Sequence, residues 1–209
     1  MCVELDEGTN EELFSTLADG RADVAVGVVP AALSASFETR DFYDERIVLL
    51  ADRGLLSSCG VDADAARRTL ATGDLSPLAA CPFVLGGPAD ITGGLGLSLF
   101  ARAGIRPRVR AQSNNMETLL ALAMRGVGAC LCPENLVEIA ASAERRRNLV
   151  SFQLGPEAQY KIRFALPAGS YRWSVTEEFM RIALESGGGN AKAAGAASGT
   201  DATSRLTAR

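Results

Sequence analysis

The chain alternates between short apolar runs and stretches in which apolar residues recur every three or four positions. The recurring spacing covers one face of an α-helix, whereas a short, continuous apolar run is typical of a strand buried on both faces. Glycines and prolines separate the two kinds of segment. We predict helices that end near residues 20, 104, 124 and 145, a last helix that starts at residue 174, and strands over residues 3–6, 23–29, 46–51, 82–85, 108–112, 129–133, 149–154 and 160–166.

The order of these elements predicts an α/β fold. A strand over residues 3–6, a helix and a strand over residues 23–29 follow one another as a β-α-β unit does. Residues 23–29 read DVAVGVV, which is nearly all apolar, as expected of a parallel strand covered on both faces. Residues 61–73 are polar and predict a loop with one helical turn, and residues 74–80 predict a short helix.

Polar residues at two helix starts are candidate ligand contacts. Thr9 and Glu12 have the spacing of a capping box, in which each side chain accepts a hydrogen bond from the other residue's backbone N–H. In the segment SNNMETLLALAMRGVG, Asn114 is the predicted N-cap and Glu117 its reciprocal partner. A helix that starts where a strand ends also exposes free N–H groups at the carboxyl edge of a sheet, where open α/β sheets bind anions. The pattern alone leaves both interpretations of this turn open, a helix cap and a ligand site.

The glycine-rich stretch GGPADITGGLG raises the question of a phosphate-binding loop. It lacks the Gly-Lys-Ser/Thr ending of a P-loop, and its glycines do not follow the G-x-G-x-x-G spacing. We interpret the stretch as a flexible loop in which Asp90 or Thr92 caps the next helix.

Cys130 and Cys132 lie two apart on a predicted strand, so their side chains point to the same face. A zinc site usually combines two pairs with C-x₂₋₄-C spacing or adds histidines, and the chain has neither. Packing in the core is the better interpretation, because free cysteine is among the most buried residue types. We therefore expect neither a metal nor another cofactor.

Composition narrows the class of protein. The 25 acidic and 21 basic residues give a net charge of −4, which argues against a protein whose main function is to bind nucleic acid through a basic face. The chain has no histidine, which removes the Ser-His-Asp and Cys-His triads, so we expect no enzyme. Five cysteines at low density predict a reducing compartment, hence the cytoplasm. No apolar run approaches the ~20 residues of a membrane span.

Four segments, in order, resemble the effector-binding domain of LysR-type transcriptional regulators. They are VELDEGTNEELFSTLADGRADVAVGVVP, FETRDFYDERIVLLADRG, SNNMETLLALAMRGVGACLCPEN and NLVSFQLGPEAQYKIRFALPAGSYRWSVTEEFM, and the match covers residues 3 to about 185. The resemblance implies a two-lobed, periplasmic-binding-protein-like fold. It also implies that a small, often anionic metabolite binds in the cleft between the lobes, and that the full-length protein forms a homo-oligomer.

The resemblance further implies where each lobe and each ligand contact lies. The chain is expected to cross between the lobes near residues 48–51 and 162–166, with Phe164 at the floor of the cleft. The expected effector contacts are Thr9 from lobe I and Ser113, Asn114, Asn115 and Met116 from lobe II. The expected domains are lobe I over residues 1–49 and 163–186, lobe II over residues 50–162, and a disordered tail of mainly small and polar residues over residues 187–209.

Two parts of the family pattern have no counterpart in these residues. One is the helix-turn-helix with its linker helix, so we expect no DNA binding by this chain alone. The other is the first strand and helix of the effector domain, so we expect an N-terminally truncated fold, from a fragment or a late gene start. A sheet without its central strand leaves edges unpaired, and we expect little cooperativity in unfolding.

The alternatives are a solute-binding protein of the same fold, which the missing signal peptide and free cysteines disfavour, and a non-functional fragment.

Overall fold

The chain builds two β-sheets, which the computed structural model describes over residues 3–169 and 173–187. The strands are β1 (Ala25–Gly27), β2 (Phe37–Asp52), β3 (Pro82–Leu85), β4 (Arg108–Gln112), β5 (Cys130–Pro133), β6 (Leu149–Gln153) and β7 (Gln159–Pro167). The larger sheet has the order β1-β7-β2-β5, with β6 also paired to β2, and its pairs are antiparallel. β3 and β4 form a separate, parallel pair.

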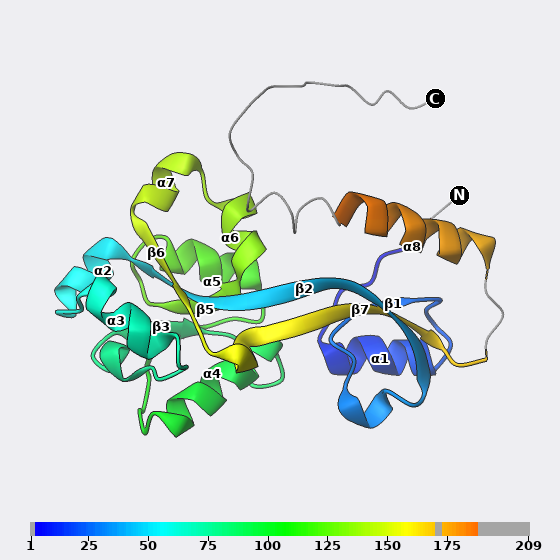
Figure 1. The fold of residues 1–209 in the computed structure, drawn as a ribbon, viewed down its shortest axis with the longest axis horizontal. Coiled ribbons are helices and arrows are strands. Elements are labelled where there is room, and N and C mark those ends of the chain that lie inside the picture. The colour runs from blue at the N-terminus through cyan, green and yellow to red at the C-terminus, as the bar shows by residue number, and fades with distance from the viewer. Residues whose placement is uncertain (1–2, 170–172, 188–209) are drawn as a thin grey trace. The chain divides into compact units, whose positions relative to one another are not determined.

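The long strand β2 runs through both ends of the larger sheet (Figure 1). It pairs with β7 from Phe37 to Arg46, and with β5 and β6 from Ile47 to Asp52. This change of partner lies next to the first predicted crossover, residues 48–51. β6 and β7 both pair with β2, β6 over residues 48–52 and β7 over residues 37–46, so the returning chain passes from one end of β2 to the other between β6 and β7. That link precedes the second predicted crossover, residues 162–166, and the lobe boundaries themselves remain predictions.

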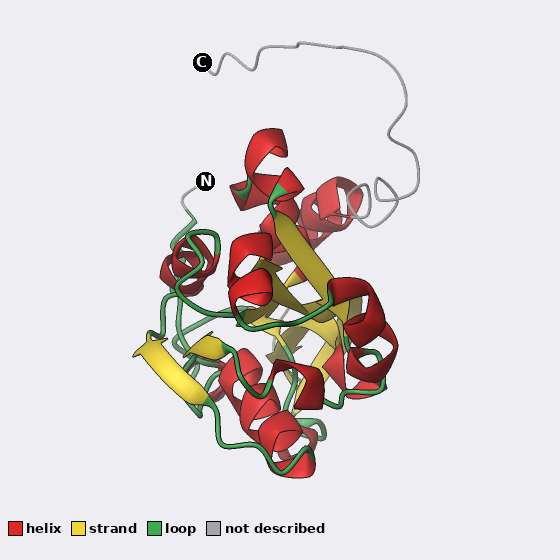
Figure 2. Ribbon diagram, turned by 90° about the vertical axis from the view of Figure 1, so that its left-hand side faces the viewer, coloured by secondary structure: helices red, strands yellow, loops and turns green. Residues whose placement is uncertain are grey.

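Helices cover the strands (Figure 2). They are α1 (Asn10–Ala18), α2 (Arg53–Ser58), α3 (Ala63–Leu70), α4 (Ile91–Arg102), α5 (Met116–Ala123), α6 (Glu134–Ala140), α7 (Ala143–Arg147) and α8 (Ser174–Gly187), with 3₁₀ turns at Ala31–Leu33, Ser76–Leu78 and Pro156–Ala158. Residues 1–170 form one unit, and α8 lies in a second. No helix within residues 3–169 and 173–187 is long and apolar enough to cross a membrane. Apart from Gly187, the predicted disordered tail, residues 187–209, lies outside the described residues.

Buried side chains on both faces of β2 hold residues 3–169 together. Leu49 faces one core, shared with α3, α4 and β3, while Val48 and Leu50 face another, shared with α5 and β5. All three are 0% exposed, as the alternation of side chains along a strand requires of a strand covered on both faces. A smaller core joins Phe14 and Leu17 of α1 to β1 and the start of β2.

Several predicted elements have the observed limits, and others are split or shortened. β3 and β4 match their predicted ranges, and the last helix begins at Ser174 as predicted. The helix predicted to end near residue 145 is two helices, because the Ser142 hydroxyl accepts a hydrogen bond from the Arg145 N–H and starts α7 anew. The predicted loop over residues 61–73 contains α3, and the short helix over residues 74–80 is a 3₁₀ turn.

The beginning of the chain differs from the prediction. Residues 3–6 are not a strand, and Val3 and Leu5 are 57% and 78% exposed. The strand predicted over residues 23–29 shrinks to β1, which is antiparallel to β7 rather than parallel to a neighbour. A strand needs a partner for its backbone N–H and C=O groups, and an apolar pattern does not supply one. The β-α-β unit lies instead at β3, α4 and β4.

Candidate functional site

The turn after β4 starts α5 with a cap one residue later than predicted. Asn115, not Asn114, is the N-cap, since its Oδ1 accepts a hydrogen bond from the Thr118 N–H at 2.8 Å. The Ser113 Oγ accepts a hydrogen bond from the Asn115 N–H at 3.1 Å. With the cap at this position the reciprocal place belongs to Thr118, so Glu117 does not complete a capping box. Asn114 is left exposed, without a role in the cap.

The glycine-rich loop after β3 lies directly beside this turn. β3 and β4 are parallel, so their carboxyl ends meet at one edge of the sheet. The Ser113 N–H donates a hydrogen bond to the Leu85 carbonyl at 3.2 Å. A Cβ atom at Gly87 would lie 2.6 Å from the Asn114 Oδ1, so the Asn114 amide rests against the Gly87 backbone. Sequence reasoning treated the loop and the turn separately, because only the strand pairing brings them together.

Gly93 brings the first turn of α4 against the same loop. A Cβ atom at Gly93 would lie 2.7 Å from the Gly87 carbonyl carbon and would overlap its oxygen, so the position requires glycine. Asp90 holds the N-cap position of α4, as one of the two predicted options, but its side chain makes no capping bond. Its carboxylate accepts a hydrogen bond from the Thr92 hydroxyl instead. The first N–H groups of α4 are therefore not covered by a side-chain cap.

Two helix N-termini thus meet at adjoining strand ends. Each carries a partial positive charge and N–H groups without intrahelical acceptors, which suits an anion. Tyr160, at the start of β7, packs partly buried against the core that contains Leu85 and Leu95. Burial raises the pKa of Tyr160, and the negative charges of Glu157 and Asp90 raise it further, so the phenol remains a hydrogen-bond donor at neutral pH. No pattern in the sequence points to Tyr160, whose strand begins far from the turn along the chain.

Thr9 caps α1 as predicted, but its hydrogen-bond donors are already used. The Thr9 N–H and Oγ donate to the Glu12 carboxylate at 2.8 and 2.9 Å, and the Glu12 N–H donates back to the Thr9 Oγ at 3.3 Å. The bond from the Thr9 N–H, followed by the bond from its hydroxyl, lowers the pKa of Glu12. A carboxylate from α1 itself therefore occupies the place that an anionic ligand would take.

Phe164 is buried in the larger sheet. It lies on β7 between β1 and β2, and its ring centroid is 4.5 Å from that of Phe42. Its side chain is 0% exposed, so it offers no surface to a ligand in this structure, and its place at a cleft floor remains a prediction. Phe164 lies in the larger sheet and Thr9 starts α1, which packs beside β1 and β7, whereas the turn before α5 follows β4 of the separate β3–β4 pair.

Cys130 and Cys132 are core residues, which confirms the packing interpretation. Both are 0% exposed and lie in the same buried group as Leu119 and Leu120 of α5. The hydrogen bond from the Cys132 thiol to Cys130, followed by burial, raises the pKa of Cys132 far above that of a free thiol, so it stays protonated. Residues 3–169 and 173–187 contain no group of three or more His, Cys, Asp or Glu side chains arranged to hold a metal ion.

Comparison with known proteins connects this geometry to a family. The LysR substrate binding domain matches residues 1–188. No curated protein sequence matches the chain.

Solved structures share the fold at low sequence identity. The effector binding domain of QuiR in complex with shikimate has a TM-score of 0.62 at 16% identity, over 87% of this chain and 79% of that one. The regulatory domain of CcmR from Synechocystis in complex with 2-PG has a TM-score of 0.65 at 16% identity, over 86% and 80%. CbnR, a LysR family transcriptional regulator, has a TM-score of 0.58 at 20% identity, over 87% and 59%. The chain belongs to the LysR substrate-binding domain family.

Proposed function

We propose that this chain is the effector-sensing part of a LysR-type transcriptional regulator and that it binds a small anionic metabolite. One observation carries the proposal: the N-termini of α4 and α5 meet at the adjacent carboxyl ends of β3 and β4. Such an edge places backbone N–H groups and positive helix ends toward the same ligand. The ligands of QuiR and CcmR, shikimate and 2-PG, are both small anions and support this class.

In the proposed site each residue of the turn has a separate task. Asn114 is exposed and presents its amide to the ligand, while Ser113 and Asn115 hold the turn through their own hydrogen bonds. Met116 is partly buried against the core of α5 and β2, so it anchors the first turn of α5. The glycine-rich loop supplies the uncapped end of α4.

The rest of the proposed assignment concerns the other lobe and the partners. We place lobe I at residues 1–49 and 163–186 and lobe II at residues 50–162. Thr9 and Phe164 would then contribute from lobe I only after Glu12 releases Thr9 and the ring of Phe164 becomes accessible. The module works without catalysis in the cytoplasm, as part of a homo-oligomer that contacts DNA through a helix-turn-helix on other residues.

The test is a ligand screen followed by one substitution. Thermal-shift screening of small carboxylates and phosphates should identify a compound that raises the melting temperature of the chain, since a ligand that binds only the folded state stabilises it. Isothermal titration then gives its affinity. Asn114→Ala should weaken that affinity by about tenfold, the loss expected for one hydrogen bond to a charged group.

The control is Asn148→Ala, which removes the same amide from an exposed position at the end of α7. It should leave the affinity unchanged. An equal loss in both variants, or none in Asn114→Ala, would show that the ligand does not contact the turn before α5.

A further inference from the structure

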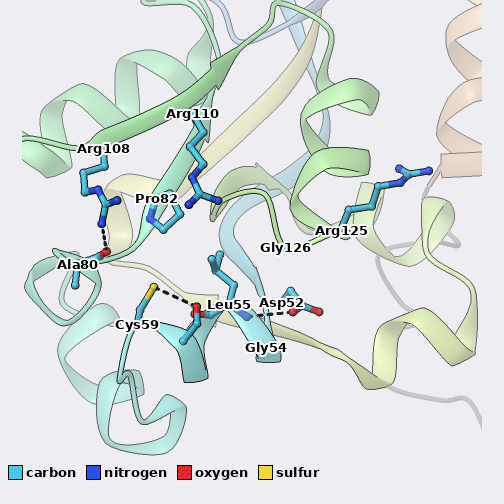
Figure 3. A pocket seen from close by; sticks show the side chains of 11 residues that line it. Asp52, Gly54, Leu55, Cys59, Ala80, Pro82, Arg108, Arg110, Arg125 and Gly126 are labelled. Carbon is cyan, nitrogen blue, oxygen red and sulfur yellow. Dashed lines mark hydrogen bonds between the residues drawn. The ribbon is translucent and has the colours of Figure 1, made fainter.

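A cavity of about 590 Å³ lies at the opposite edge of the β3–β4 pair from the proposed effector site. It is lined by Pro82 and Arg108, which are the first residues of β3 and β4, whereas the proposed effector site lies beyond their last residues. The end of β2, the start of α2 and the turn after α5 complete its wall (Figure 3). A four-residue strand advances about 13 Å, so two ligands could bind at the two edges without touching.

Two arginines from one strand line this cavity. Arg108 and Arg110 are separated by one residue on β4, whose pairing with β3 skips Arg110, and both line the cavity. Arg108 donates one hydrogen bond to the Ala80 carbonyl and Arg110 one to the Val127 carbonyl, each at 3.2 Å. A guanidinium has five N–H donors, so each keeps several for another partner.

Neither guanidinium is neutralised by a carboxylate. Within residues 3–169 and 173–187 no ion pair joins Arg108 or Arg110 to an acidic side chain, whereas Arg46 and Arg102 have such partners. In Figure 3 the guanidinium of Arg110 points toward the middle of the cavity, and that of Arg108 toward Ala80 at its rim. Unpaired arginines around a concave surface are suited to bind oxyanions, because a guanidinium can bind two oxygens at once.

Two other charged residues, Arg125 and Asp52, line the cavity. Arg125 also belongs to the lining, but its guanidinium points away in Figure 3 and donates to the Ala121 carbonyl at 3.0 Å. Asp52 is the acidic residue of the lining, and its carboxylate accepts the Leu55 N–H at 3.1 Å as the cap of α2. Arg108 and Arg110 together outnumber the one negative charge of Asp52, and an oxyanion with several oxygens and charges can engage both guanidinium groups at once.

We propose that this cavity is a second anion-binding site, which takes a small, multiply charged oxyanion of the phosphate class between Arg108 and Arg110. The site is separate from the turn before α5 and does not depend on the proposed function. Because both arginines are exposed, binding should weaken as the salt concentration rises.

Pyrophosphate is the probe, and acetate is the single-charged comparison. Isothermal titration of the 209-residue chain at low salt should show pyrophosphate binding and no measurable acetate binding. Arg110→Gln should weaken pyrophosphate binding by about tenfold, the loss expected for a charge-assisted pair, and Arg108→Gln by a similar factor. Arg106→Gln removes the same charge just before β4, outside the lining, and should leave the affinity unchanged. Asn114→Ala should also leave it unchanged, which separates this site from the effector site.

A second measurement needs no variant. Phenylglyoxal modifies accessible arginines, and mass spectrometry locates the modified residues. Pyrophosphate should protect Arg108 and Arg110 and leave Arg106 reactive. Equal protection of all three arginines, or equal loss of affinity in all three glutamine variants, would mean that pyrophosphate binds through the overall positive charge and not at a specific site. That outcome, or the absence of binding at low salt, would overturn the proposal.

Discussion

At the start of α1, the Glu12 carboxylate from the same helix takes both donors of Thr9. At the start of α5, Asn115 accepts one N–H and Asn114 stays exposed beside Gly87. Both turns follow the rules of helix capping. In the α1 turn the donors of Thr9 are bonded within the helix, whereas in the α5 turn Asn114 stays exposed at a strand end. A cap motif with glutamate in the third helical position therefore argues against an anion site, because the glutamate carboxylate already accepts the hydrogen bonds that an anionic ligand would accept.

The supports of the two turns differ as well. The α5 turn follows β4, which is paired with β3, and α5 packs into a core with β2 and β5. The α1 turn follows residues 3–8, which have no regular structure. A ligand site must be held in place by its surroundings, so the α5 turn is the better placed of the two.

Among substitutions that test this comparison, Gly93→Ala is expected to have the largest effect on stability and on effector binding. The new methyl group would overlap the Gly87 carbonyl, and such overpacking typically costs about 1–3 kcal/mol of unfolding free energy. It should also displace the loop and abolish effector binding.

Gly94→Ala is the matched control, since its nearest atom, the Pro88 carbonyl oxygen, is 3.5 Å from the new Cβ. Alanine favours helix there, so this variant should gain up to about 1 kcal/mol. Urea unfolding measures both, and equal stabilities would contradict the close approach of α4 and the loop.

A smaller effect distinguishes the two asparagines of the α5 turn. Asn115→Ala removes the N-cap bond to the Thr118 N–H and should cost about 1 kcal/mol in urea unfolding. Asn114→Ala should change stability by less than about 0.5 kcal/mol, as for other exposed positions. If Asn114→Ala cost as much as Asn115→Ala, the cap would lie where the sequence predicted it rather than where the structure has it.

The smallest effect concerns the closed turn at Thr9. Its hydrogen bonds lower the pKa of Glu12, so their stabilising contribution is present above the unfolded pKa and is lost as pH falls through the lower, folded value. Thr9→Ala removes the hydroxyl bond and should move the Glu12 pKa back up, as followed by NMR titration of its side-chain carbonyl. The backbone N–H remains in the variant, so the return should be partial. An unchanged pKa would mean that the Thr9 hydroxyl does not donate to Glu12 in solution.

Local patterns predicted the parts of the site that depend on neighbouring residues along the chain. The limits of β3 and β4, the burial of Cys130 and Cys132 and the cap at Thr9 all follow from periodicity or short-range spacing. The predicted cap was one residue from the observed one, Asn115, because two consecutive asparagines have the same capping ability and the sequence does not distinguish between them.

The sequence by itself determined the α/β class, the resemblance to the LysR family and the position of a polar turn before α5. Tertiary structure alone decided that Gly87 rests against Asn114, that residues 3–6 form no strand, and that Arg108 and Arg110 line a cavity. Periodicity records which face of an element is apolar. It does not record which element lies beside it, and a strand partner, a close backbone approach or a shared cavity depends on that neighbour.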